Sequence, residues 1–74
     1  MPTIVIVDDR VTNRRILSRL AGDLDDNILV ESFADPLDAL AWLREQPADL
    51  IITDFKMPQM DGAAFIHELR QLGN

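Results

Sequence analysis

The sequence predicts a single α/β domain over residues 1–74, with a parallel sheet and the element order β-α-β-α-β-α. Three short, apolar runs rich in β-branched residues are the candidate strands, and each is followed by a stretch with helical spacing of apolar residues. Because a helix lies between consecutive strands, right-handed crossovers can place the strands parallel in one sheet.

The first strand is expected from Thr3 to Val7, a continuous apolar run of the kind found in parallel strands covered on both faces. A helix follows from about residue 10 or 11 to Leu24, and Asp9 is its candidate N-cap. Its expected apolar face consists of Ile16, Leu17, Leu20 and Leu24. Turn residues at 22–27 then separate this helix from the next strand.

The second strand is expected at 28–33, where the polar residues Glu31 and Ser32 favour an edge position in the sheet. The second helix has a clear start signal, with Asp35 as N-cap and Pro36 as first helical residue. We expect it to run to residue 45 or 46, because a proline follows there.

The third strand is expected at 49–53, and it ends directly at a carboxylate, Asp54. After a loop, a third helix is expected to start near Gly62 and to end at Gly73 as its C′ residue. The apolar residues of this helix are Phe65, Ile66, Leu69 and Leu72.

Carboxylates follow two of the three candidate strands. Asp8 and Asp9 come directly after the first strand, and Asp54 comes directly after the third. In parallel sheets the carboxyl ends of neighbouring strands meet at one edge, where α/β proteins place their ligand sites. Three crowded carboxylates repel one another unless a cation neutralises them, and all-oxygen ligands suit a hard cation, so we expect Mg²⁺.

The sequence resembles the receiver domain of two-component response regulators, a phospho-acceptor module of flavodoxin-like fold. The resemblance covers the whole chain and is carried by the pair Asp8-Asp9, by Asp54, and by the loop Lys56-Met57-Pro58-Gln59-Met60-Asp61-Gly62. It implies a sheet with strand order two-one-three, the first helix on one face and the other two helices on the opposite face.

The resemblance also implies the chemistry. Asp54 would accept a phosphoryl group in a bacterial phosphorelay, from a sensor histidine kinase, a phosphotransfer protein or a small acyl phosphate. Mg²⁺ would be bound by Asp9 directly, by Asp8 mainly through water, by Asp54, and by the backbone carbonyl of Lys56. Met57 and Met60 would be packing residues. On this basis we predict that the chain is not an enzyme.

Several other interpretations compete with this one. Asp8 and Asp9 could serve only as a turn and cap, and His67 could be a phospho-carrier, although a single histidine on a polar helix face is usually solvated. The arginines of the first helix could bind an anion, but they more often form a solvated or partner-binding face. A phosphatase of the haloacid dehalogenase type would need an acid where Lys56 stands.

The composition argues against several classes of function and of site. The formal charge of −6 argues against direct nucleic-acid binding, and the absence of cysteine excludes a disulfide framework or a thiolate metal site. No apolar run is long enough for a membrane span and no leader pattern is present, so we expect a soluble, cytoplasmic protein without membrane contact.

The 74 residues correspond to three of the five strands that the resemblance implies. The family's Ser/Thr after strand four, and its aromatic residue and Lys on strand five, have no counterpart, so we expect impaired phosphorylation and switching. The third strand would have a bare edge, which favours strand addition. We therefore expect a homodimer through this strand, with a six-stranded sheet. The alternative to the phospho-acceptor function is a non-phosphorylated half-receiver that acts as a self-associating or docking module.

Overall fold

The computed structural model describes residues 2–54, 56–58 and 60–72. Within these ranges the chain forms, in order, β1 (Thr3–Val7), α1 (Val11–Leu24), β2 (Leu29–Phe33), α2 (Pro36–Glu45), β3 (Leu50–Thr53) and α3 (Gly62–Gln71). This order confirms the predicted alternation of strands and helices.

The described strands form one parallel sheet with β1 at its centre and the order β2-β1-β3. Val7 at the end of β1 lies opposite Phe33 of β2 and Thr53 of β3. The three strands therefore end at the same level, and the residues that follow them meet at one edge of the sheet. The predicted strand order two-one-three and the edge position of β2 are both confirmed.

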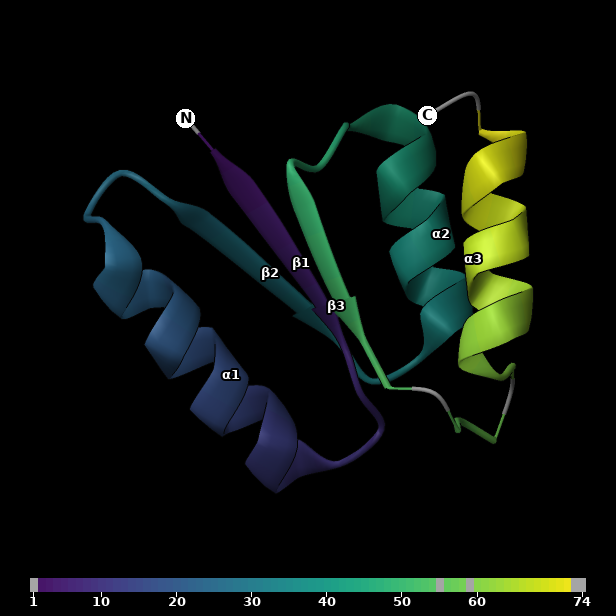
Figure 1. Cartoon of the computed structure of the whole chain (residues 1–74), viewed down its shortest axis with the longest axis horizontal. Helices are drawn as coiled ribbons and strands as arrows, with labels where there is room; N and C mark the ends of the chain where they lie inside the picture. The colour runs from purple at the N-terminus through teal and green to yellow at the C-terminus, as the bar shows by residue number, and fades with distance from the viewer. Residues whose placement is uncertain (1, 55, 59, 73–74) are drawn as a thin grey trace.

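Helices cover the two faces of the sheet unequally (Figure 1): α1 lies on one face, and α2 and α3 lie side by side on the other. Because side chains alternate along a strand, β1 supplies both cores. Val5 and Val7 belong to the cluster that includes buried residues of α2 and α3, whereas Ile4 and Ile6 belong to the cluster under α1. The predicted distribution of the helices is confirmed.

The predicted apolar face of α1 is wrong in three of its four members. Ile16, Leu20 and Leu24 have exposed fractions of 53%, 60% and 73%, while Leu17 packs against the sheet beside the buried Ala21. Leu17 and Ala21 are four residues apart and share one stripe of the helix, and the three exposed residues form the adjacent stripe. In the part of the chain that the structure describes, only the first stripe faces the sheet.

The helix starts follow the sequence signals in part. Asp35 caps α2, and its side chain accepts a hydrogen bond from the backbone N–H two residues later at 2.9 Å. Asp61 caps α3, a role that was not among the predictions, and its Oδ1 accepts a hydrogen bond from the backbone N–H three residues later at 2.8 Å. The prediction that Asp9 caps α1 is wrong: the helix begins at Val11, so the N-cap is Arg10, whose side chain makes no capping hydrogen bond.

Two strands begin one residue later than expected. Ile28 precedes β2 because its N–H bonds to the carbonyl of Asp25 in the preceding turn, at 3.3 Å. Asp49 precedes β3, and its carboxylate accepts a hydrogen bond from the backbone N–H of Thr3 at 2.7 Å. The predicted C′ residue of the last helix, Gly73, lies outside the described residues.

Candidate functional site

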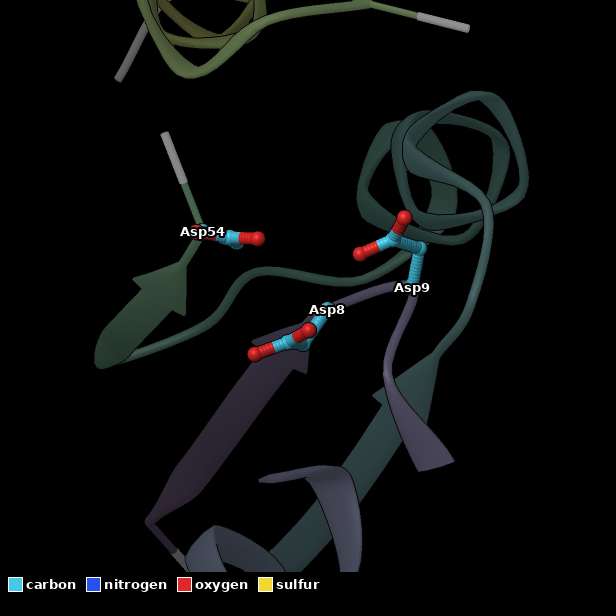
Figure 2. A group of neighbouring side chains, drawn as sticks. All are labelled: Asp8, Asp9 and Asp54. Atoms are coloured by element: carbon cyan, nitrogen blue, oxygen red, sulfur yellow. The ribbon is translucent and has the colours of Figure 1, made fainter. Parts of the chain in front are cut away.

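Three aspartates from two strand ends form a cluster at the carboxyl edge of the sheet (Figure 2). Asp8 and Asp9 follow β1, Asp54 follows β3, and each offers a carboxylate oxygen that lies within 4.8 Å of the others. The cluster arises because β1 and β3 are parallel neighbours that end at the same level. The structure thus brings together all three acids that the sequence singled out.

Backbone hydrogen bonds fix two members of this cluster to the sheet. The N–H of Asp8 donates to the carbonyl of Phe33 at 3.0 Å, and the N–H of Asp54 donates to the carbonyl of Val7 at 2.9 Å. Each bond continues the strand pairing one step beyond the last strand residue. The main chain therefore positions these two carboxylates before any ligand arrives, which is the arrangement that a preorganised site requires.

The three carboxylates differ in their exposure to solvent. Asp8 is buried, with 5% of its surface exposed, and its Oδ1 accepts a hydrogen bond from the backbone N–H of Arg10 at 2.9 Å. Asp54 is half-buried and Asp9 is exposed. A ligand from solvent therefore has its most open approach beside Asp9, with Asp8 at the base of the cluster.

The loop after β3 is anchored in the core. Met57 is buried and packs with residues of β1, α2 and α3, and Met60 packs against the same cluster. Lys56 is exposed. Positions 55 and 59 of the loop lie outside the described residues. The role of the Lys56 carbonyl as a metal ligand remains a prediction.

The donor set fits a hard divalent cation. All three side chains offer carboxylate oxygens, which are the ligands that Mg²⁺ and Ca²⁺ prefer. With Mg–O distances of about 2.1 Å, two oxygens on one Mg²⁺ lie at most about 4.2 Å apart. Oxygens that lie within 4.8 Å of one another are therefore close enough to serve one such cation, directly or through water.

Sequence reasoning missed one residue at this site. The guanidinium of Arg14 on α1 donates a hydrogen bond from Nη1 to the backbone carbonyl of Asp8 at 2.8 Å. Nothing in the local sequence distinguishes Arg14 from its neighbours Arg15 and Arg19, because the bond depends on how α1 lies against the loop after β1.

Comparison with known proteins gives a consistent family assignment. Residues 4–74 match the family described as the response regulator receiver domain. The chain is 44% identical over 69 residues to the cyclic di-GMP phosphodiesterase response regulator RpfG of Xanthomonas campestris pv. campestris, covering 93% of this chain and 18% of that protein. It is 39% identical over 67 residues to a probable chemotaxis protein CheY of Rhizobium etli, covering 90% of this chain and 51% of that protein.

The prediction that the protein is not an enzyme is wrong, because this sequence does not support that conclusion. A protein-glutamate methylesterase/protein-glutamine glutaminase of Xanthomonas oryzae pv. oryzae is 36% identical over 64 residues, and the phosphodiesterase regulator above is also named for an enzymatic activity. The chain spans 18% of each of these two relatives, which corresponds to the receiver segment alone. A receiver sequence therefore neither assigns nor excludes catalysis by the protein that contains it.

Solved structures agree with the fold. The N-terminal domain of a protein from Wolinella succinogenes superposes with a TM-score of 0.87 at 26% identity, covering 100% of this chain and 58% of that chain. A response regulator receiver protein from Pseudomonas putida superposes with a TM-score of 0.82 at 27% identity, covering 95% of this chain and 57% of that chain.

Among the described residues, no helix is both long and apolar enough to cross a membrane. The strand order, the aspartate cluster and the match over nearly the whole chain lead to one conclusion: this chain belongs to the response regulator receiver domain family.

Proposed function

We propose that this chain is a phospho-acceptor of a two-component phosphorelay, with Asp54 as the acceptor and Mg²⁺ as the cofactor. The observation that carries the proposal is the convergence of three carboxylates, within 4.8 Å, at the strand ends of a receiver fold. The donor would be a sensor histidine kinase or a phosphotransfer protein. Small acyl phosphates would serve as alternative donors.

In the proposed reaction, a carboxylate oxygen of Asp54 forms a bond to phosphorus. The bond between phosphorus and the donor atom breaks, and its electron pair leaves with the donor, either an imidazole nitrogen or an acyl oxygen. The product is an acyl phosphate on Asp54. The position of Asp54 supports this role, because its half-buried carboxyl group is held at the sheet edge while a side of the cluster stays open to solvent.

The other two aspartates would bind the metal. Asp9 is exposed and suits direct ligation, whereas Asp8 is buried and engaged with the Arg10 N–H, which suits contact through water. When bound, Mg²⁺ would offset the negative charge of the carboxylates and of the incoming phosphoryl oxygens. The carbonyl of Lys56 completes the proposed ligand set. A cytoplasmic location in a bacterium is also part of the proposal, and the relatives quoted above are all bacterial.

The test is the intact mass of the 74-residue chain after incubation with acetyl phosphate. We expect a single phosphoryl adduct in the presence of Mg²⁺ and none with a chelator, because the crowded carboxylates repel an incoming phosphate without a cation. We expect the adduct to form slowly in this chain by itself, since the family's Ser/Thr and Lys that hold the phosphoryl group have no counterpart among its residues.

Equal modification with and without the chelator would contradict the proposed metal dependence. The absence of an adduct in a chain that circular dichroism shows to be folded would contradict the acceptor role of the 74 residues. It would favour the alternative proposal of a docking module that is not phosphorylated.

For the 74-residue chain we also propose self-association through β3. Among the described residues β3 pairs only with β1, so its other edge offers backbone groups to a further strand. Leu50 on this strand is 50% exposed, and its neighbour Ile51 lines an apolar cavity of about 280 Å³ together with Leu43, Ala48, Ile66, Leu69 and Arg70. A second copy of the chain would pair with β3 and cover this surface.

Sedimentation velocity tests this proposal with two matched variants. Leu50→Lys places a charge on the β3 edge and is expected to convert a dimer into a monomer. Leu37→Lys is the control, because Leu37 is 51% exposed but belongs to α2. A monomeric parent chain, or equal dissociation by both substitutions, would contradict pairing through β3.

A further inference from the structure

Arg14 connects the first helix to the acidic cluster. Its Nη1 donates to the backbone carbonyl of Asp8 at 2.8 Å, a contact between residues six positions apart in the chain. Its backbone N–H donates to the carbonyl of Arg10 at 3.0 Å, at the start of α1. Arg14 is half-buried, so this bond is partly shielded from solvent. One residue thus joins the first turn of α1 to the peptide that follows Asp8.

That peptide links two of the proposed metal ligands. The carbonyl of Asp8 belongs to the peptide unit between Asp8 and Asp9, and a planar peptide unit turns as a rigid body. Asp8 is already held through its N–H by Phe33 and through its Oδ1 by the N–H of Arg10. The bond from Arg14 holds the remaining polar group of Asp8, its carbonyl, and with it the direction in which the chain proceeds to Asp9.

We propose that Arg14 is a positioning residue for the metal site, which orients the Asp8–Asp9 peptide so that both carboxylates can serve one cation. This inference rests on the proposed function, because it concerns the same Mg²⁺ site. Partners that orient metal ligands without touching the metal commonly change metal affinity by about 10–100-fold when they are removed. Arg14 makes this contact with a backbone carbonyl rather than with a carboxylate.

The charge of Arg14 allows two effects on Mg²⁺ affinity to be separated, because electrostatic repulsion and positioning change the affinity in opposite directions. A guanidinium near a cation site repels the cation, so its removal should by electrostatics alone strengthen Mg²⁺ binding. Loss of positioning should instead weaken Mg²⁺ binding. Arg15 provides the matched control: it carries the same charge, follows Arg14 in α1, is exposed, and lines the same surface cavity of about 430 Å³.

The experiment measures the Mg²⁺ affinity of the 74-residue chain and its variants by isothermal titration calorimetry. Arg14→Met keeps an unbranched apolar stem and is expected to lower the affinity about tenfold. Arg15→Met is expected to stay within about twofold of the parent, as exposed substitutions usually do. Arg14→Lys retains a donor that can reach a carbonyl, and it is expected to recover part of the affinity.

A second readout is the amide resonance of Arg10 in metal-free protein, observed by ¹⁵N NMR. Because this N–H bonds to Asp8 Oδ1, it is expected to shift in Arg14→Met and to stay unchanged in Arg15→Met. Equal Mg²⁺ affinities for the two methionine variants, or tighter binding by both, would overturn the positioning role. If Arg14→Met does not fold, Arg14→Gln decides, because its shorter side chain removes the long-reach contact with the Asp8 carbonyl: a parental affinity and an unmoved Arg10 resonance would overturn the role.

The two proposals fail in different ways. A parent chain that binds no Mg²⁺ would overturn the metal site itself, and the Arg10 resonance would then still report whether Arg14 orients the loop. If the parent chain binds Mg²⁺ and substitution of Arg14 does not change the affinity, only the positioning role is overturned. The phospho-acceptor proposal would then be unaffected.

Discussion

Replacing Asp54 with asparagine is expected to abolish formation of the phosphoryl adduct. A carboxamide oxygen is a much weaker nucleophile than a carboxylate and cannot form the acyl phosphate. Asparagine has nearly the same size and shape, and the backbone N–H of residue 54 would keep its bond to the Val7 carbonyl. The substitution therefore changes chemistry with little change in structure. Intact mass after incubation with acetyl phosphate and Mg²⁺ measures the result.

A matched control separates the acceptor from general effects of charge. Asp23→Asn removes one negative charge from an exposed position near the end of α1, and it is expected to leave the adduct unchanged. Hydroxylamine treatment of the phosphorylated parent should release the phosphoryl group, because acyl phosphates react with this nucleophile. An adduct that persists in Asp54→Asn, or that resists hydroxylamine in the parent, would place the modification on another residue.

The second large effect is expected in the core. Phe65 of α3 is fully buried in the cluster formed by β1, α2 and α3, where it packs with Val5, Val7 and Leu40. Truncation of a buried phenylalanine to alanine costs about 3–5 kcal/mol, from lost burial and the cavity that remains. A domain of this size has a total stability on the order of 5–10 kcal/mol. Phe65→Ala is therefore expected to remove much of the folding free energy.

Urea denaturation followed by circular dichroism measures this change. The control is Ile66→Ala in the same helix, because Ile66 is 44% exposed and its truncation is expected to cost about 1 kcal/mol or less. A similar loss of stability in both variants would mean that α3 contributes to folding through its helix propensity rather than through the buried ring. The effect of Phe65→Ala would then not report on packing in this cluster.

Some features followed directly from the sequence because they depend on local patterns. The start of α2 was predictable because an aspartate N-cap and a proline at the first helical position act within one turn. The strand order was predicted through the family resemblance, and the edge position of β2 through its polar residues. The meeting of Asp8, Asp9 and Asp54 also followed, since parallel strands that end at one level bring their next residues together.

Other features depended on contacts between distant segments. Whether Ile16 or Leu17 of α1 faces the sheet depends on how the helix docks against it, and the apolar spacing alone could not distinguish the two stripes. Likewise, Asp9 could not be excluded as a cap until the register of α1 showed Arg10 in that position. Both errors arose where a local pattern allowed two arrangements.

The sequence by itself thus determined the element order, the parallel sheet and the three acids of the site, because periodicity and strand ends are properties of short segments. Only the tertiary structure decided how the site is held. It decided that Asp8 is buried while Asp9 is exposed, and that Arg14 rather than Arg15 reaches the Asp8 carbonyl. The physical reason is that burial and long-range hydrogen bonds depend on how a helix docks against its sheet, and segments with similar sequence patterns can dock in more than one way.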